Sequence, residues 1–185
     1  MTRYAALLRG VNVGGRKPVA MADLRSTVAE LGFANVATLI QSGNLVFDSA
    51  RRREPASVAA QLETELARRL DLETAVFVRT GDELTGVIAS NPYVDEARTN
   101  PGRLVVMFLA AAPLAADVAR LRSAIVGPET VASSGRHLYV TYPAGQATTK
   151  LTNAVIEKTL GTRGTARNWN TVLRIDSALT GGAGG

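Results

Sequence analysis

Apolar residues at the start of the chain form either short continuous runs or runs at helical spacing. The run 4–8 is short and mostly apolar, which predicts a buried strand. Over 20–31 the apolar residues recur every three or four positions and end before Gly32, which predicts a helix with a glycine at its C-terminal end. We therefore expect a strand, a loop and a helix in that order.

The next stretch predicts a hairpin, a second helix and a further strand. Two short apolar runs, 36–40 and 45–48, flank the turn sequence Gln-Ser-Gly-Asn. Pro55 opens a helix whose apolar residues recur every fourth position, and 74–78 follows as a strand. The order is strand-helix-strand-strand-helix-strand.

The same order returns in the second half of the chain. A helix over 81–90, which ends at an Asn-Pro pair, and a polar linker over 95–102 connect the two halves. The pattern then predicts further helices from Pro113, over 149–160 and after Asn168, and strands at 104–109, 130–132, 137–142 and 165–167.

This repetition predicts an α+β protein of two consecutive ferredoxin-like units, each with the β-α-β-β-α-β order of an α-β plait, joined by a helix and followed by a C-terminal helix. A single larger mixed sheet would give the same order of elements and is the alternative. The predicted divisions are a first unit at 1–79, a connecting helix and linker at 80–102, a second unit with the C-terminal helix at 103–180, and a flexible tail at 181–185.

Composition adds a basic bias and excludes several kinds of chemistry. The 185 residues include 21 Lys or Arg and 16 Asp or Glu, and the resulting net charge of +5 permits attraction to nucleic acid or small phosphates. The basic residues are nearly all arginine, so the charge equally fits a compositional habit of the source genome. The absence of cysteine and the single histidine, His137, exclude disulfides, thiolate catalysis and a His-rich metal centre. We expect no metal and no cofactor.

No apolar run near the N-terminus is long enough for a signal sequence or a membrane span. We therefore expect a cytoplasmic protein with no membrane partner. The oligomeric state stays open.

Candidate binding residues gather first in the loop after the first strand. Three glycines within six residues let the backbone approach a ligand closely, while Arg9, Arg16 and Lys17 favour an anion. The ferredoxin-like order brings the end of the first strand beside the tip of the hairpin. We therefore expect a polar cradle for an anion or a polar base edge, made of Arg9, Asn12, Gly14, Gly15, Gln41, Ser42 and Asn44.

The second half has a polar cluster of its own. Residues 148–153 are expected to begin a helix, whose free N–H groups and dipole attract anions, and the last strand ends at the same edge. Whether the two clusters meet in one cleft depends on how the units dock. The candidates of the second cluster are Lys150, Asn153, Arg167, Asn168 and Trp169.

Several of these candidates have a purely structural alternative. Asn168 is also a typical helix N-cap, and Trp169 is a typical core residue. The polar residues of the hairpin are also typical turn formers.

Two well-known motifs fit the chain poorly. The segment 10–17 approaches the phosphate-loop pattern, but it has Arg-Lys where Lys-Ser or Lys-Thr is needed, and Pro18 and Val19 delay the helix. The aromatic-rich signature of RNA-recognition modules is missing from 45–48. No dinucleotide fingerprint, acidic metal cluster or nucleophile elbow is present.

A set of segments in fixed order resembles a known family. They are Leu-Arg-Gly-Val-Asn-Val-Gly-Gly at 8–15, Met-Ala-Asp-Leu-Arg at 21–25, Gln-Ser-Gly-Asn-Leu-Val-Phe at 41–47, Leu-Thr-Asn at 151–153 and Thr-Ala-Arg-Asn-Trp-Asn-Thr-Val at 165–172. Together they resemble a widespread bacterial family of unknown function with a Leu-Arg-Gly-Ile-Asn-Val-Gly-Gly signature, from which Val11 and Ala166 depart. The resemblance implies a duplicated ferredoxin-like fold and brings no activity with it.

The leading functional hypothesis is binding of a phosphate-bearing or other anionic small ligand at a polar site between the units, with or without chemistry. One alternative is nonspecific binding of nucleic acid through surface arginines at 51–53, 68 and 69. A second is an enzyme whose general base is an acid or a lysine. A third is a protein whose conspicuous residues only fix loops and the docking of the units.

Overall fold

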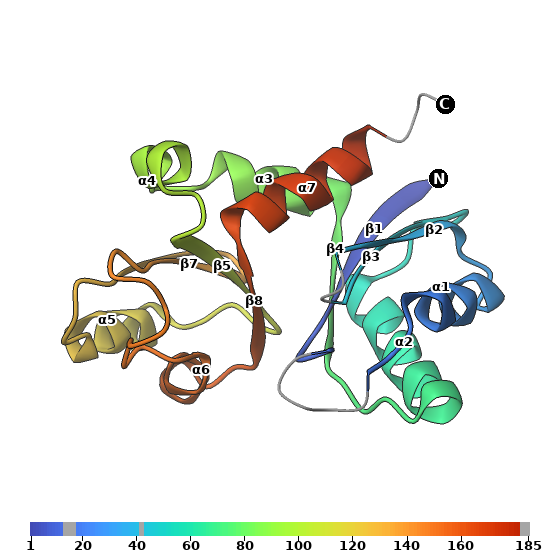
Figure 1. Ribbon diagram of the computed structural model, residues 1–185, viewed down its shortest axis with the longest axis horizontal. Coiled ribbons are helices and arrows are strands. Elements are labelled where there is room, and N and C mark those ends of the chain that lie inside the picture. The colour runs from blue at the N-terminus through green and yellow to red at the C-terminus, as the bar shows by residue number, and fades with distance from the viewer. Residues whose placement is uncertain (13–17, 41–42, 182–185) are drawn as a thin grey trace. The chain divides into compact units, whose positions relative to one another are not determined.

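The computed structural model describes residues 1–12, 18–40 and 43–181 and contains two four-stranded antiparallel sheets (Figure 1). The chain divides into two compact units: unit 1 is Met1–Thr85 with Arg174–Gly185, and unit 2 is Gly86–Leu173. The prediction of an α+β protein with two ferredoxin-like units and a C-terminal helix is confirmed, and the alternative of one larger mixed sheet is wrong.

Unit 1 has the strand order β2-β3-β1-β4, so β2 and β4 are its edge strands. Helices α1 and α2 cover one face of this sheet (Figure 1). Its elements are β1 (Thr2–Leu8), α1 (Met21–Glu30), β2 (Ala34–Leu39), β3 (Asn44–Ser49), α2 (Pro55–Leu70) and β4 (Val76–Thr80).

Unit 2 has the corresponding strand order β6-β7-β5-β8. Helices α3 and α7 each cross the boundary between the units. The remaining elements are α3 (Gly81–Ala89), α4 (Val94–Thr99), β5 (Leu104–Leu109), α5 (Ala115–Ala124), β6 (Thr130–Ser134), β7 (His137–Thr141), α6 (Asn153–Leu160), β8 (Gly164–Asn168) and α7 (Trp169–Thr180).

Two local predictions are wrong. The expected linker over 95–102 contains the short helix α4, which has Asp95 and Glu96 in its first turn and Arg98 in its last. The helix expected from residue 149 begins only at Asn153, because Thr152 is its N-cap and accepts a hydrogen bond from the Val155 N–H. Thr149 instead lies in the preceding loop, where its hydroxyl donates to Glu129.

The two sheets repeat one hydrogen-bonding plan. Ala5 of β1 lies opposite Arg79 of β4, and Val106 of β5 lies opposite Arg167 of β8. The first strand N–H of each of these edge strands donates to a helix carboxylate: that of Val76 to Glu63 of α2 at 2.8 Å, and that of Gly164 to Glu157 of α6 at 2.7 Å. A side chain thus covers a backbone donor that an edge strand would otherwise leave open.

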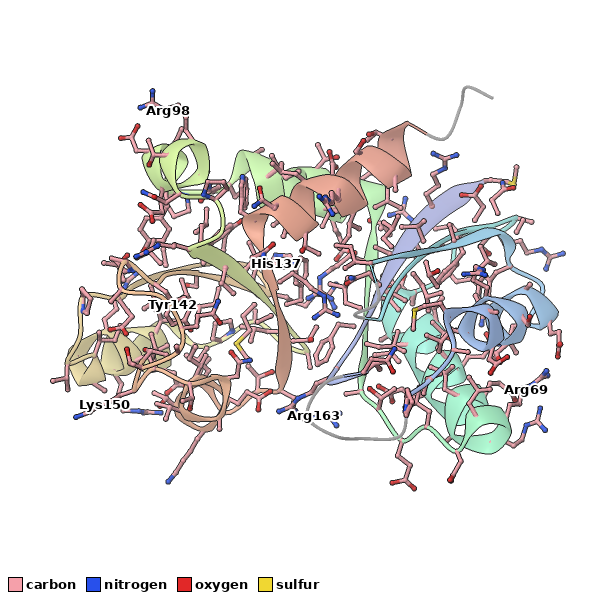
Figure 2. All side chains as sticks on the ribbon, in the orientation of Figure 1. Arg69, Arg98, His137, Tyr142, Lys150 and Arg163 are labelled. Carbon is pink, nitrogen blue, oxygen red and sulfur yellow. The ribbon has the colours of Figure 1, made fainter. Side chains whose placement is uncertain are left out.

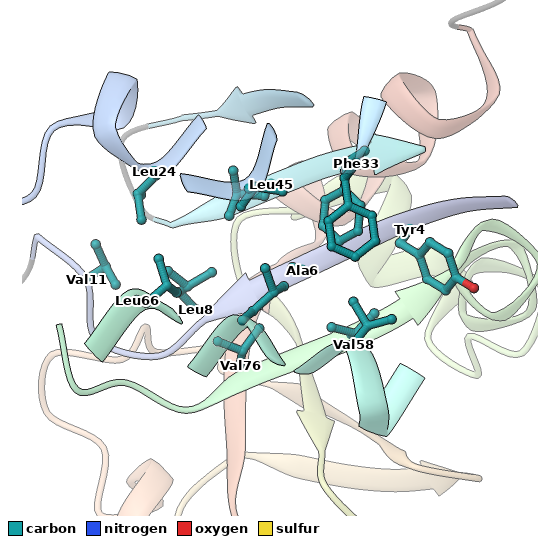
Figure 3. Packing of buried hydrophobic residues seen from close by; sticks show 14 residues of the cluster. Tyr4, Ala6, Leu8, Val11, Leu24, Phe33, Leu45, Val58, Leu66 and Val76 are labelled. Atoms are coloured by element: carbon teal, nitrogen blue, oxygen red, sulfur yellow. The ribbon is translucent and has the colours of Figure 1, made fainter. Parts of the chain in front are cut away.

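Each unit has its own hydrophobic core between its sheet and its helices. In unit 1, Leu24 of α1 and Leu66 of α2 are fully buried against Tyr4, Leu45 and other residues of one sheet face (Figure 3). In unit 2 the core lies between α5, α6 and alternate residues of β5, β6 and β7. Both cores follow the periodicities expected for a helix packed on a sheet.

The sheet faces that point away from these cores are buried as well. Leu7 and Arg79 in unit 1 are 0% and 1% exposed, and Phe108 and Tyr139 in unit 2 are 0% and 1% exposed. Strands that are buried on both faces read as continuous apolar runs rather than as alternating patterns. This explains why the strand sequences at 4–8 and 104–109 lack polar residues at alternate positions.

Gly43 in the β2–β3 turn is a position where a side chain does not fit. Its φ is +72°, and a Cβ there would lie 3.0 Å from Leu8 Cβ and 3.2 Å from Val11 Cβ. We expect Gly43→Ala to lower the free energy of unfolding by about 1–3 kcal/mol, measured by urea denaturation. Gly102→Ala, at a site with nothing within 4 Å and no positive φ, is the control and should stay within about 0.5 kcal/mol of the parent protein. Equal stability of the two variants would contradict the steric argument.

Candidate functional site

The predicted meeting of the first loop with the hairpin turn is confirmed. The Leu8 N–H donates to the Gly43 carbonyl at 2.8 Å, and Gly43 packs against Val11. The loop before β4 joins them, because the Arg9 N–H donates to the Ala75 carbonyl at 3.0 Å. Three loops of unit 1 thus converge around Arg9, at the end of β1; we call this region the β1 end.

The Asn12 side chain forms two hydrogen bonds with the backbone of Val19. Its side-chain Oδ1 accepts the Val19 N–H at 2.8 Å, and its Nδ2 donates to the Val19 carbonyl at 3.1 Å. These two hydrogen bonds join the end of the described part of the loop to the residue two positions before α1. Both polar atoms of the Asn12 amide thus bind the backbone of Val19.

Left-handed backbone conformations are concentrated at the β1 end. Gly10 and Gly43 have φ of +66° and +72°, while the non-glycine residues Asn12 and Ile40 have φ of +54° and +59°. Ile40 is unusual, because a β-branched side chain is strongly disfavoured there, and it is also 44% exposed. Such strained residues are concentrated at ligand sites and switch regions in folded proteins.

Other predicted residues of the first cluster divide into two groups. Asn44 is fully buried, and its Nδ2 donates to the Leu39 carbonyl at 3.1 Å within the hairpin. Its side chain lies on the sheet face opposite the core face that contains Leu45. The other four predicted residues, Gly14, Gly15, Gln41 and Ser42, lie outside the described residues.

The candidates of unit 2 lie on different elements. Lys150 and Asn153 are exposed, in the loop before α6 and at its first residue (Figure 2). Ala166 packs against the core on the helix side of the sheet, so the neighbouring Arg167 lies on the opposite face. The prediction that Lys150 begins the same helix as Asn153 is wrong, because Lys150 precedes the N-cap Thr152.

Asn168 and Trp169 have structural roles. The Asn168 Oδ1 accepts the Thr171 N–H at 2.9 Å, which makes Asn168 the cap of α7. Trp169 is 5% exposed. Thr80 occupies the corresponding position before α3, where it exchanges hydrogen bonds with Glu83 as a capping box.

Arg167 is a cation with a strongly shifted pKa. One guanidinium nitrogen donates to the Thr165 hydroxyl and to the Ala166 carbonyl, both at 2.8 Å. Burial lowers the pKa of Arg167 to about 10. The charge is therefore held in a poorly solvated place on the face of the second sheet.

A cavity of about 810 Å³ lies beside the far end of the first loop, between Pro18–Ala20 and the end of α2. Its lining includes three acids, Asp23, Asp71 and Glu73, and two bases, Arg68 and Arg69. The excess of acidic residues disfavours an anionic ligand in this cavity.

The two arginines of this cavity are already paired. Arg68 and Arg69 donate to Glu65, each at 2.7 Å, and Arg69 also pairs with Glu30. Hydrogen bonds from Arg68 and then Arg69 lower the pKa of Glu65. Paired arginines contribute less to nucleic-acid attraction than their number indicates.

Two further findings concern the described residues only. They contain no group of three or more His, Cys, Asp or Glu side chains arranged to hold a metal ion. Among them, no helix has the length and apolar character needed to cross a membrane.

Sequence reasoning missed three residues of the β1 end. Thr74 donates its hydroxyl to the Arg9 carbonyl at 2.8 Å, Val19 holds the Asn12 side chain, and Ile40 has the left-handed backbone described above. The position of Thr74 just before a strand was the one sequence feature that could have indicated its hydrogen bond to the loop after β1. No local pattern marks Val19 or Ile40.

Comparison with known proteins adds a family and a fold relative. The chain is similar to a conserved bacterial protein, SP0830 from Streptococcus pneumoniae, at 25% sequence identity and a TM-score of 0.76, over 97% of this chain and 99% of that one. No curated protein matches the chain. The family model "Protein of unknown function (DUF1697)" matches residues 1–139. The chain therefore belongs to the DUF1697 family of proteins of unknown function.

Proposed function

We propose that the protein binds a phosphate-bearing or other anionic small ligand at the β1 end of unit 1. The observation that carries this proposal is the convergence of three loops around Arg9, with left-handed backbone at four described positions. Glycine at two of them allows a ligand to approach the main chain closely. Turns with left-handed residues also present N–H groups that form anion-binding concavities.

The charges near this end also favour an anion. Arg9 lies at the junction of the loops and is partly buried, so its charge is less screened than that of a fully exposed arginine. The sequence between the bridged residues Asn12 and Val19 adds Arg16 and Lys17 and no acidic residue. A planar guanidinium is the side chain best suited to a phosphate or carboxylate.

Thermal and chemical denaturation with added anions test the proposal. With inorganic phosphate, pyrophosphate and a nucleoside monophosphate as probes, a bound anion at a hundred times its Kd stabilises the fold by about 2.7 kcal/mol. We expect Arg9→Gln to remove most of this stabilisation. Arg51→Gln, which changes an exposed arginine of the same unit, should keep it.

Two results would count against the proposal. One is the absence of stabilisation by any of the anions beyond that given by sodium chloride at equal ionic strength. The other is stabilisation that persists unchanged in Arg9→Gln, because the anion would then bind elsewhere on this basic protein.

A further inference from the structure

The outer edge of β2 differs from the other sheet edges. In the described residues, Glu63 covers a backbone group of β4, Glu157 one of β8, and Arg122 one of β6, where its Nε donates to the Val131 carbonyl at 3.0 Å. No described residue outside β3 forms a hydrogen bond with the backbone of Ala34–Leu39. An uncovered edge of this kind pairs readily with another extended chain.

A groove runs along this edge within unit 1. A cavity of about 610 Å³ lies between the end of β2 and the C-terminal part of α7, and it is lined by Leu39, Ile40, Ala178 and neighbouring residues. A second cavity of about 330 Å³ shares Leu39 and Ala178 with it and reaches Arg3. Ile40 leaves much of an apolar side chain in water at the open end of the groove.

The groove and β2 are lined by positive charge. The larger cavity has no acidic residue in its lining. Arg174 of α7 lines that cavity, is exposed, and has no ion-pair partner among the described residues. Arg25 of α1 donates to the Thr38 hydroxyl of β2 at 2.9 Å, on the core-facing side of the strand. In the smaller cavity Asp48 is paired with Arg3 at 3.2 Å and accepts from Asn35 at 2.7 Å.

From these features we propose that β2 is a docking site for an extended acidic segment of a partner protein, which adds to the sheet as a fifth strand. Its main chain pairs with the open edge from Ala37 to Leu39, beyond the bulge between Ala34 and Ala37. Alternate side chains then point to opposite faces of the sheet. Acidic residues on the core-facing side of the added strand meet Arg25, and residues on the other side enter the groove, where apolar side chains fill it and one acidic side chain meets Arg174.

A second copy of this chain fits the edge less well. Pairing of β2 with the same strand of another copy would place Arg25 and Arg174 of both copies along one seam. Like charges across paired strands destabilise the pairing. The net charge of +5 likewise favours an acidic partner over a second copy.

A synthetic peptide of alternating glutamate and valine, with one central valine replaced by glutamate so that both faces carry a carboxylate, is capped at both ends and labelled with a fluorophore to test the proposal. We expect saturable binding, measured by fluorescence anisotropy, and changes in backbone amide NMR signals of β2. Arg25→Glu and Arg174→Glu, each at an exposed position, should weaken binding by about tenfold or more. Arg51→Glu is the matched charge reversal away from β2 and should weaken it far less.

Four outcomes would overturn the proposal. They are failure of the peptide to bind, equal weakening by Arg51→Glu and the two groove variants, NMR changes away from β2, and self-association of the free protein through β2 in analytical ultracentrifugation. A version of the peptide with lysine in place of glutamate should not bind. Binding of both peptides alike would remove the role of charge.

Discussion

Replacing Phe47 with alanine is expected to lower the free energy of unfolding by about 3–5 kcal/mol. Phe47 is 2% exposed on the core face of β3 and lies between two other rings. Its ring centroid is 4.6 Å from that of Phe33 and 6.0 Å from that of Tyr4. Removal of the ring therefore takes away its buried apolar surface and leaves a cavity that the neighbouring rings only partly fill.

The substitution of Phe47 would also weaken contacts outside the core. The Tyr4 hydroxyl donates to the Arg53 carbonyl and accepts the Arg53 N–H, each at 2.8 Å, which ties β1 to the segment before α2. The Arg53 guanidinium lies 5.6 Å from the Phe33 ring centroid. Phe47 thus supports a tyrosine and a phenylalanine that both hold the start of α2.

Urea denaturation of the parent protein, Phe47→Ala and Phe47→Leu measures the effect. Phe47→Leu keeps most of the buried volume and should cost less than half as much as Phe47→Ala, because overall volume is largely conserved. A loss below about 1 kcal/mol for Phe47→Ala would mean that the cluster collapses to fill the cavity. Equal losses for the two variants would mean that the ring packing, rather than the volume, determines stability.

The fold was predictable because both units repeat a local pattern. Continuous apolar runs at 4–8 and 104–109 and helical spacing after Pro55 and Pro113 mark elements that the structure contains. Boundaries were less predictable where side chains compete with the backbone. The N-cap at Thr152 moves the start of α6 to Asn153, and β4 begins at Val76 because Thr74 and Ala75 are held by Arg9.

The meeting of the loop after β1 with the hairpin turn was predictable, whereas the burial and hydrogen bonds of the side chains there were not. The strand order alone brings the loop after β1 beside the hairpin turn, as the bond from Leu8 to Gly43 confirms. Asn44 is buried because the sheet face opposite the core is covered. The sequence pattern does not predict whether that second face is covered. The face of Arg167 follows from strand alternation, since Ala166 faces the core. Reasoning from the ends of elements therefore leaves the sheet face of each side chain undetermined.

Alkaline pH should destabilise the protein through Tyr139 and Tyr142. Both are nearly inaccessible, at 1% and 2% exposure, and their hydroxyls donate to the Val87 carbonyl at 2.7 Å and the Leu151 carbonyl at 3.1 Å. Burial raises the pKa of each to about 12, and Glu129 adds to the rise at Tyr142. In the unfolded chain a tyrosine ionises near pH 10.

The direction of this change in stability follows from the number of protons that the folded and unfolded chains bind at each pH. Below pH 10 both states keep the two phenolic protons, so stability is unaffected by them. Between pH 10 and 12 the unfolded chain releases these protons while the folded chain retains them, so the free energy of unfolding falls by about 1.4 kcal/mol per pH unit for each tyrosine, or about 5 kcal/mol in total. Arg167 acts in the opposite direction over this range, because its lowered pKa lets the folded chain lose a proton that the unfolded chain keeps.

Urea denaturation from neutral pH to pH 12, in parallel with tyrosinate absorbance, separates these contributions. Tyr139→Phe and Tyr142→Phe each lose one hydrogen bond, a pH-independent cost of about 1 kcal/mol. Each should also remove its share of the fall in stability above pH 10, while the contribution of Arg167 is common to all the proteins and cancels in the comparison. If both variants keep the full slope of the parent protein, the fall has another origin. Tyrosinate formation in the folded state that is complete by pH 10 would show that water reaches these hydroxyls.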